Sequence, residues 1–236
     1  MNNNKSIKKT VGIIGGMGPE ATSDLFEKII NFTDANSDQE HIHLVIDNNT
    51  DINDRSHYIL NKENSPEKEL IKTAQKLEKY GVDFIAMPCN TAHYFYEKIQ
   101  LAVGIPILNM IKETATYLKE NKKDLNFTLL ATEGTYTSDI YKKEFEKFGL
   151  NIIYPKKEHK NILMEAIYNF KKSKPVDIEK LNNVIDKMNM EKQSLFVLGC
   201  TELPLIFKKY SIKYDFIDTT EILAKSIIKR ANYNLK

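Results

Sequence analysis

The sequence predicts an α/β protein with mainly parallel sheets, built from two similar halves. Short runs rich in valine, isoleucine, leucine and phenylalanine alternate with longer segments of helical period, which is the pattern of successive βαβ units. A strand followed by a glycine-containing loop occurs twice, as VGIIGGMG at residues 11–18 and FTLLATEG at residues 127–134. The 236 residues are enough for one large α/β domain or two small ones, and the repeat favours two.

The expected strands are short and lie between segments that have helical periodicity. The strands are expected at residues 11–14, 42–47, 82–87, 105–108, 127–130, 151–153, 195–198 and 214–217. The helices are expected at residues 19–32, 66–80, 91–103, 109–120, 137–148, 161–171, 177–190 and 219–231. Ser65 before Pro66 is typical of a helix start, and Gly81 is placed as a C-cap. Residues 48–56, NNTDINDRS, are expected to form a polar loop.

Each half places a cysteine directly beyond a buried strand. Cys89 follows the start of the first repeat, Val11, by 78 residues, and Cys200 follows Phe127 by 73 residues. Ligands of open α/β sheets bind beyond the carboxyl ends of the strands, so we expect the two thiols on opposite sides of one cleft. The first domain is expected to comprise residues 1–110 with 211–236, and the second residues 111–210.

Composition and charge argue against several classes of protein. The formal net charge is only +2 and lysines alternate with carboxylates, so we expect no nucleic-acid or membrane partner. No apolar run approaches the roughly 18 residues of a membrane span, and the N-terminus lacks a signal sequence, which favours a cytoplasmic protein. The two cysteines are 111 residues apart without a C-x-x-C pattern, so neither a disulfide framework nor a metal site is expected.

The paired cysteines are the strongest chemical signal. A lone cysteine at a strand end is more often core filling than catalytic. Here each cysteine is followed closely by a threonine, Thr91 or Thr201, and each precedes an expected helix N-terminus, where the dipole favours the thiolate. Two such thiols suit the removal of a proton from one face of a carbon and the return of a proton to the other face.

Polar residues beside the cysteines are candidates for binding an amino acid. Asn90, Thr91, Thr201 and Glu202 are placed to hold an α-carboxylate and an ammonium group, and helix capping is an equally weighted role for them. The glycines at residues 15–18 match neither G-x-G-x-x-G nor a G-K-[ST] loop, so they favour a tight turn near a small anion over a nucleotide site.

Arg55 is one of only two arginines among 34 basic residues. A guanidinium binds a carboxylate through two parallel hydrogen bonds, which suits an acidic substrate side chain, and a surface ion pair is the equally weighted alternative. His93, in the expected helix after Cys89, is interpreted as structural rather than catalytic.

Three motifs taken together resemble the aspartate/glutamate racemase family. They are GGMGPEAT at residues 15–22, MPCNTAH at residues 87–93 and GCTELP at residues 199–204. The resemblance implies two flavodoxin-like domains with pseudo-two-fold symmetry, a site at their interface, no pyridoxal phosphate or other cofactor, and a homodimer. It also implies that Cys89 and Cys200 are the acid/base catalysts. The expected substrate-binding residues are Met17, Asn49, Arg55, Asn90, Thr91, Thr132, Lys171, Thr201 and Glu202.

Other details of the resemblance favour the aspartate branch. Family members carry a lysine after an Ile-Tyr pair like that at residues 167–168, and we prefer Lys171 over Lys172 for this role. Glutamate racemases carry Asp-Ser and histidine where this chain has Gly16-Met17 and Glu202. The choice between aspartate, glutamate and a wider range stays open, as do a hydantoin- or maleate-type isomerase and a non-catalytic amino-acid-binding or redox-sensing protein.

Overall fold

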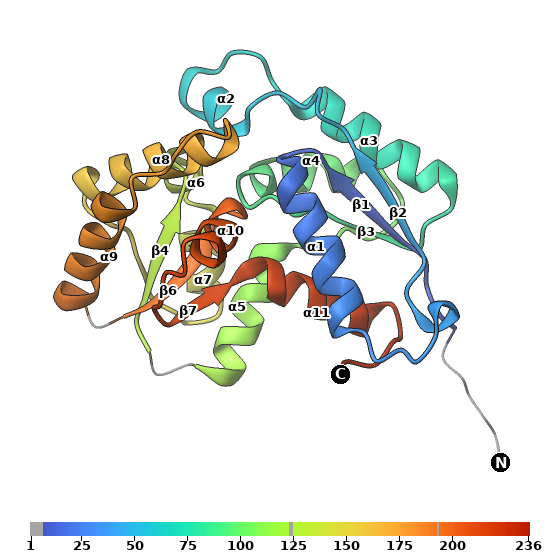
Figure 1. The fold of residues 1–236 in the computed structure, drawn as a ribbon. Coiled ribbons are helices and arrows are strands. Elements are labelled where there is room, and N and C mark those ends of the chain that lie inside the picture. The colour runs from blue at the N-terminus through green and yellow to red at the C-terminus, as the bar shows by residue number, and fades with distance from the viewer. Residues whose placement is uncertain (1–6, 123–124, 193) are drawn as a thin grey trace.

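Two parallel sheets lie side by side in the computed structural model, which describes residues 7–122, 125–192 and 194–236 (Figure 1). The first sheet has the order β2-β1-β3 and the second has the order β5-β4-β6-β7, with every pair parallel. Their strands are β1 (Val11–Gly15), β2 (Leu44–Asn48), β3 (Phe84–Ala86), β4 (Phe127–Ala131), β5 (Ile152–Ile153), β6 (Leu195–Gly199) and β7 (Phe216–Asp218). The predicted α/β class with parallel sheets is confirmed.

The strand order repeats between the halves, apart from the fourth strand. In each half the first strand lies between the second and the third. The second half adds β7 beside β6, whereas the strand expected at residues 105–108 is reduced to a bridge between Ile85 and Ile107. The Pro106 carbonyl accepts the Ile85 N–H at 2.9 Å, but proline has no N–H to donate to the next rung of a parallel ladder.

The helices differ from expectation mainly near the carboxyl ends of the strands. An unexpected helix, α2, occupies the end of the predicted polar loop. The segment expected as one helix at 91–103 begins as a 3-10 turn, and the one at 137–148 is divided at Asp139, whose φ is 54°. The helices are α1 (Pro19–Phe32), η1 (Asp38–Glu40), α2 (Arg55–Asn61), α3 (Glu67–Tyr80), η2 (Thr91–Phe95), α4 (Tyr96–Leu101), α5 (Met110–Asn121), α6 (Glu133–Ser138), α7 (Ile140–Lys147), α8 (Lys157–Lys171), α9 (Ile178–Lys192), α10 (Glu202–Lys209) and α11 (Thr219–Arg230).

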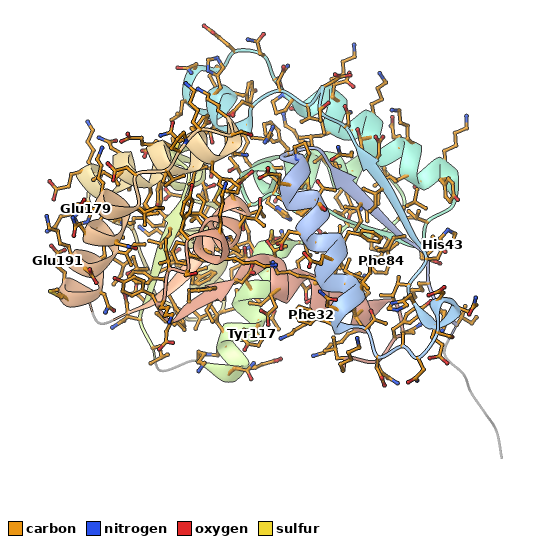
Figure 2. The ribbon with its side chains drawn as sticks, in the orientation of Figure 1. Phe32, His43, Phe84, Tyr117, Glu179 and Glu191 are labelled. Carbon is orange, nitrogen blue, oxygen red and sulfur yellow. The ribbon has the colours of Figure 1, made fainter. Side chains whose placement is uncertain are left out.

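Helices cover both faces of each sheet because the strands are apolar on both sides. In β6, Phe196 and Leu198 pack towards α8, α9 and α10, whereas Val197 packs towards α5 and α7. In the first half α1 and α11 share a core with β1 and β3, to which Phe84 belongs, and α3 and η2 cover the other face (Figure 2). None of the described helices is long and apolar enough to cross a membrane.

The C-terminal segment belongs to both halves, which differs from the expected domain division. The sequence predicts residues 211–236 in the first domain, but β7 pairs with β6 in the second sheet. The helix that follows β7, α11, packs against α1 of the first half and α5, and Leu235 forms a bridge with Thr33 at the end of α1. Lys28 of α1 reinforces this junction, because its ammonium lies 3.1 Å from Asp218 and also pairs with Asp24.

Candidate active site

The two cysteines line one small cavity between the halves. Both are free thiols and both are 5% exposed. The cavity volume of about 20 Å³ is room for about one water molecule, so a larger ligand would require the two halves to move apart. Its lining residues are Met17, Asp54, Arg55, Ser56, Cys89, Asn90, Thr91, Thr132, Tyr168, Lys171, Cys200, Thr201 and Glu202.

Strand register explains how the sequence brings these residues together. Ala131 of β4 pairs with Gly199 of β6, so the next residues, Thr132 and Cys200, leave the sheet side by side. Cys89 comes three residues after β3 and precedes η2 in the first half. The carboxyl ends of the strands therefore deliver both thiols to the same cavity, as expected for α/β sheets.

Cys200 faces a carboxylate. Its Sγ donates a hydrogen bond to Glu202 Oε2 at 3.0 Å, and Glu202 Oε1 accepts from Lys171 Nζ at 2.5 Å. Burial, and next the negative charge of Glu202, raise the pKa of the Cys200 thiol well above its usual value. Burial lowers the pKa of Lys171, but attraction to Glu202 outweighs burial and raises it. Cys200 is therefore held as a thiol in this structure.

Cys89 instead faces a guanidinium. Arg55 is 8% exposed, and its Nη1 donates to the carbonyls of Ile52 and Asn53, while Nη2 donates to the Met17 carbonyl at 3.0 Å. Its buried Nε has no hydrogen-bond partner among the described residues. Burial lowers the pKa of Arg55, but attraction to Cys89, and next to Asp54, raises it above its ordinary value. A fixed positive charge thus lies beside the Cys89 sulfur.

His93 fixes the backbone at Cys89 rather than entering the cavity. Its Nε2 accepts the Met110 N–H at 3.0 Å, so the proton sits on Nδ1 and is donated to the Cys89 carbonyl at 2.9 Å. Burial lowers the pKa of His93 to about 4, which keeps the ring neutral near pH 7. The contacts agree with the predicted structural role.

Hydroxyl groups close the cavity across the two halves. Thr91 Oγ1 lies 3.0 Å from Thr132 Oγ1 and 2.8 Å from Thr135 Oγ1, and Ser56 donates to Thr132 at 3.1 Å. Ser56 and Thr91 come from the first half, whereas Thr132 and Thr135 come from α6 and its N-cap in the second. An added Cβ on Gly134 would lie 2.6 Å from Ser56 Cα, so α2 and α6 approach closely at this point.

Asn90 and Thr201 are buried beside the cysteines, each 2% exposed. The Asn90 amide donates to Thr219 Oγ1 at 3.3 Å and its oxygen accepts from Tyr141 at 2.5 Å. Thr201 donates to Glu202 Oε2 at 3.4 Å. Both residues thus line the cavity with side chains that are already oriented by the protein.

Most residues predicted for the site line this cavity, with one exception. Asn49 does not line it. Its side-chain amide donates to Thr73 Oγ1 at 2.8 Å, and its backbone carbonyl packs against Gly16, whose φ is 89°. Asn49 therefore supports the turn after β1. Lys171 lines the cavity and Lys172 does not. Three lining residues were not predicted as substrate contacts: Asp54, Ser56 and Tyr168, whose hydroxyl donates to Asp54 at 3.0 Å.

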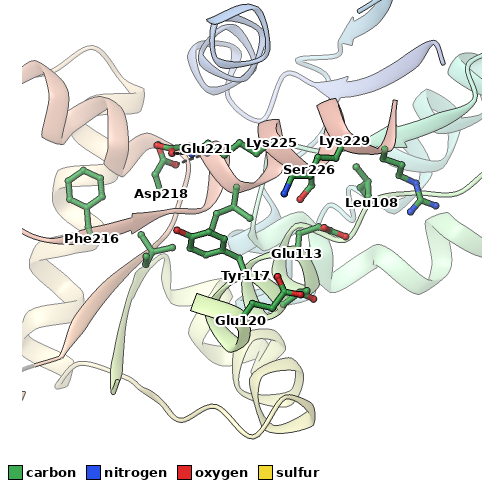
Figure 3. A pocket seen from close by; sticks show the side chains of 14 residues that line it. Leu108, Glu113, Tyr117, Glu120, Phe216, Asp218, Glu221, Lys225, Ser226 and Lys229 are labelled. Atoms are coloured by element: carbon green, nitrogen blue, oxygen red, sulfur yellow. Dashed lines mark hydrogen bonds and ion pairs between the residues drawn. The ribbon is translucent and has the colours of Figure 1, made fainter. Parts of the chain in front are cut away.

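A larger hollow of about 540 Å³ lies between α5, α11 and β7 (Figure 3). Its lining is charged, with Glu113, Glu120, Lys225 and Lys229, and contains neither cysteine. The larger of these two cavities is therefore not the one that holds the thiols. Across the described ranges, no group of three or more His, Cys, Asp and Glu side chains is arranged to hold a metal ion. The thiol-lined cavity is therefore the candidate active site.

Comparisons with known proteins match the whole arrangement. The family model described as Asp/Glu/hydantoin racemase matches residues 14–227. The broad-specificity amino-acid racemase RacX of Bacillus subtilis is 31% identical over 224 residues, covering 92% of this chain and 96% of that protein. The aspartate racemase of Picrophilus torridus superposes with a TM-score of 0.83 at 34% identity, covering 97% of this chain and 96% of that one. An aspartate racemase homologue from Pyrococcus horikoshii gives a TM-score of 0.73 at 29% identity over 94% of this chain and 99% of its own. The chain therefore belongs to the aspartate/glutamate/hydantoin racemase family.

Proposed function

We propose that the protein interconverts L- and D-aspartate by proton transfer between Cys89 and Cys200, without a cofactor. The observation that carries this proposal is the pair of buried free thiols that line one cavity together with the charged side chains of Arg55 and Lys171. One thiolate removes the α-proton, the other thiol gives its proton to the opposite face, and the substrate leaves with its configuration inverted. No oxidant or reductant is needed, because one proton is taken and one is returned.

The proposed substrate contacts follow from the same geometry. The ammonium of Lys171 and the guanidinium of Arg55 supply positive charge for the distal carboxylate, with the unpartnered Nε of Arg55 as one donor. The hydroxyl groups of Thr91, Thr132 and Thr201 are donors for the α-carboxylate, where negative charge grows as the α-proton leaves. We also expect a small acidic amino acid as the only partner besides a second copy of the chain.

Circular dichroism of L-aspartate and L-glutamate, incubated separately with metal-free protein, tests the proposal. Loss of optical activity with aspartate, accompanied by deuterium incorporation at Cα in deuterated water, is the expected result. No change with either amino acid, from a folded sample, would contradict racemase activity on acidic substrates.

A broader range of amino acids is the second candidate function. Glu202 already neutralises Lys171, the Asp54 carboxylate lines the cavity together with Arg55, and carbonyl groups already accept three N–H bonds of Arg55. The cavity therefore has little unbalanced positive charge. Racemisation of neutral amino acids at rates close to that of aspartate would favour this second candidate over an aspartate-specific enzyme. The hydantoin- and maleate-type reactions are checked with the same protein and those substrates.

A further inference from the structure

Glu202 is buried between a lysine and a catalytic thiol, and both of its oxygens are engaged. The side chain is 4% exposed. Oε1 accepts from Lys171 at 2.5 Å, and Oε2 accepts from Cys200 at 3.0 Å and from Thr201 at 3.4 Å. The sequence predicts Glu202 as a substrate contact. Its hydrogen bonds instead place the carboxylate to act on the Cys200 sulfur.

The charged groups beside the two sulfurs have opposite signs. A carboxylate within hydrogen-bond distance favours the S–H form of Cys200, whereas the charged group beside Cys89 is the guanidinium of Arg55. Lys171 weakens the effect of the carboxylate on Cys200, because its ammonium donates to the other oxygen of Glu202, Oε1. The charged or titratable groups that line the cavity around Cys200 are Glu202 from α10, Lys171 and Tyr168 from α8, Arg55 from α2, Asp54 at its N-cap, and Cys89 before η2.

We propose that Glu202 is a positioning residue that holds the Cys200 sulfur as an oriented S–H group, with Lys171 limiting the strength of that hold. The resting protein then carries Cys89 as the base and Cys200 as the acid. This assignment rests on the proposed racemase function. After turnover the proton has moved from substrate to Cys89 and from Cys200 to product, so water must protonate Cys200 and accept the proton of Cys89 before the resting form returns.

The ionisation of Cys200 can be measured without substrate. In a Cys89→Ser protein Cys200 is the only thiol, so each iodoacetamide adduct found by mass spectrometry reports on it. Alkylation requires the thiolate, so its rate at a fixed pH near 8 follows the thiolate fraction. The Glu202→Gln change removes the charge and keeps the size, and Lys171→Gln removes the opposing charge. Glu133→Gln is the matched control, because Glu133 begins α6 as Glu202 begins α10 but does not line the cavity.

Opposite changes in rate are the expected signature. Glu202→Gln is expected to alkylate at least about threefold faster, because a tenfold rise in thiolate is partly offset by the lower nucleophilicity of a weaker base. Lys171→Gln is expected to alkylate at least about threefold more slowly, and Glu133→Gln at the parent rate. If both site variants react faster, they have merely opened the cleft and the proposal fails. It also fails if Glu202→Gln is unchanged or if Lys171→Gln reacts as fast as the parent, a result that is independent of Glu202→Gln folding. Racemase activity is not part of this readout, so failure of the proposed function is seen separately.

Discussion

The surroundings of Cys89 and Cys200 differ although the two halves repeat one strand order. Each sulfur lies just beyond the third strand of its half. Cys89 has a guanidinium beside it and its carbonyl is fixed by His93, whereas Cys200 donates to the Glu202 carboxylate and its carbonyl accepts the Leu203 N–H at 3.0 Å. The repeat thus sets where the thiols lie, and residues outside the repeat set their chemistry.

The largest expected effect comes from removing either thiol. Cys89→Ser and Cys200→Ser are each expected to lower kcat/KM for racemisation by at least about 10²-fold, because one acid/base group is lost. The two enantiomers have equal free energies in water, so each variant must lose kcat/KM equally in both directions. Polarimetry from each enantiomer checks this, and substantial racemisation by either variant would contradict the two-base mechanism.

Hydrogen exchange sharpens the comparison between the thiols. In deuterated water each single variant is expected to exchange Cα–H of only one enantiomer, opposite for the two variants, without inversion. We expect Cys200→Ser to exchange faster, because its remaining sulfur lies beside Arg55 rather than Glu202. Proton NMR of L- and D-aspartate measures both rates. Equal rates from the two variants would mean that their surroundings do not differ in effect.

Arg55→Lys is expected to weaken the Cys89 side next. Lysine keeps the charge but cannot bond three carbonyl groups and a carboxylate at once, so kcat/KM for aspartate should fall more than tenfold, or more than about 1.4 kcal/mol. Steady-state kinetics measure the loss. Arg230→Lys, at the other arginine, is the matched control because that residue is exposed on α11. Unchanged kinetics in Arg55→Lys would return Arg55 to a structural role.

Gly134→Ala tests closure from the Cys200 side. The added Cβ would lie 2.6 Å from Ser56 Cα, so we expect α2 and α6 to be held apart and kcat to fall by about three- to tenfold. Stability should fall by up to about 2 kcal/mol, because overpacking against the Ser56 backbone costs more than the roughly 1 kcal/mol that alanine gains over glycine as a helix former. Kinetics and urea unfolding separate these effects. Gly104→Ala, where the nearest atom is a flexible Glu78 carboxylate oxygen at 3.3 Å, is the control and should retain kcat.

The prediction with the smallest effect on catalysis concerns stability and the hydrogen bond from His93 to the Cys89 carbonyl. An unfolded histidine gains a proton near pH 6.5, but burial lowers the folded pKa of His93 to about 4. The stability from neutral His93 is therefore present above about pH 6.5 and is lost as pH falls towards 4, at up to about 1.4 kcal/mol per pH unit. His93→Gln keeps a donor and an acceptor, so its urea-unfolding free energy should fall less between about pH 7 and pH 5. An unchanged pH slope would contradict this.

Periodicity and the repeat were sufficient to predict most of the fold, and the misses have local causes. The strand at 105–108 failed because Pro106 cannot extend the ladder. The helix α2 was hidden among turn-forming residues, although Asp54 accepts the His57 N–H at 2.8 Å as an N-cap does. The second-sheet pairing of β7 depends on long-range contacts that periodicity does not carry.

The candidate site could be predicted where motifs place residues at strand ends. Tyr168 was missed although it lies three residues before Lys171 on the same helix, a spacing that puts both side chains on one face. Asn49 lies outside the cavity lining, and the sequence could not show this because a polar residue after a strand can serve either a ligand or a turn. The charged groups beside the two sulfurs are Arg55 at Cys89 and Glu202 at Cys200. The sequence does not show which charged side chain lies beside which sulfur, because this depends on the folded structure.

The two crossings of the chain between the halves have a mechanical consequence. The backbone passes from one half to the other near Asn109 and again at Asp218–Thr219, where Thr219 accepts from Asn90 and donates to the Leu198 carbonyl at 2.8 Å. With the halves joined at these two places, we expect their main relative movement to be rotation about the line that connects the two crossings. The contact between α2 and α6 is the part of the boundary that such a rotation would separate. We therefore expect substrate to enter beneath α2.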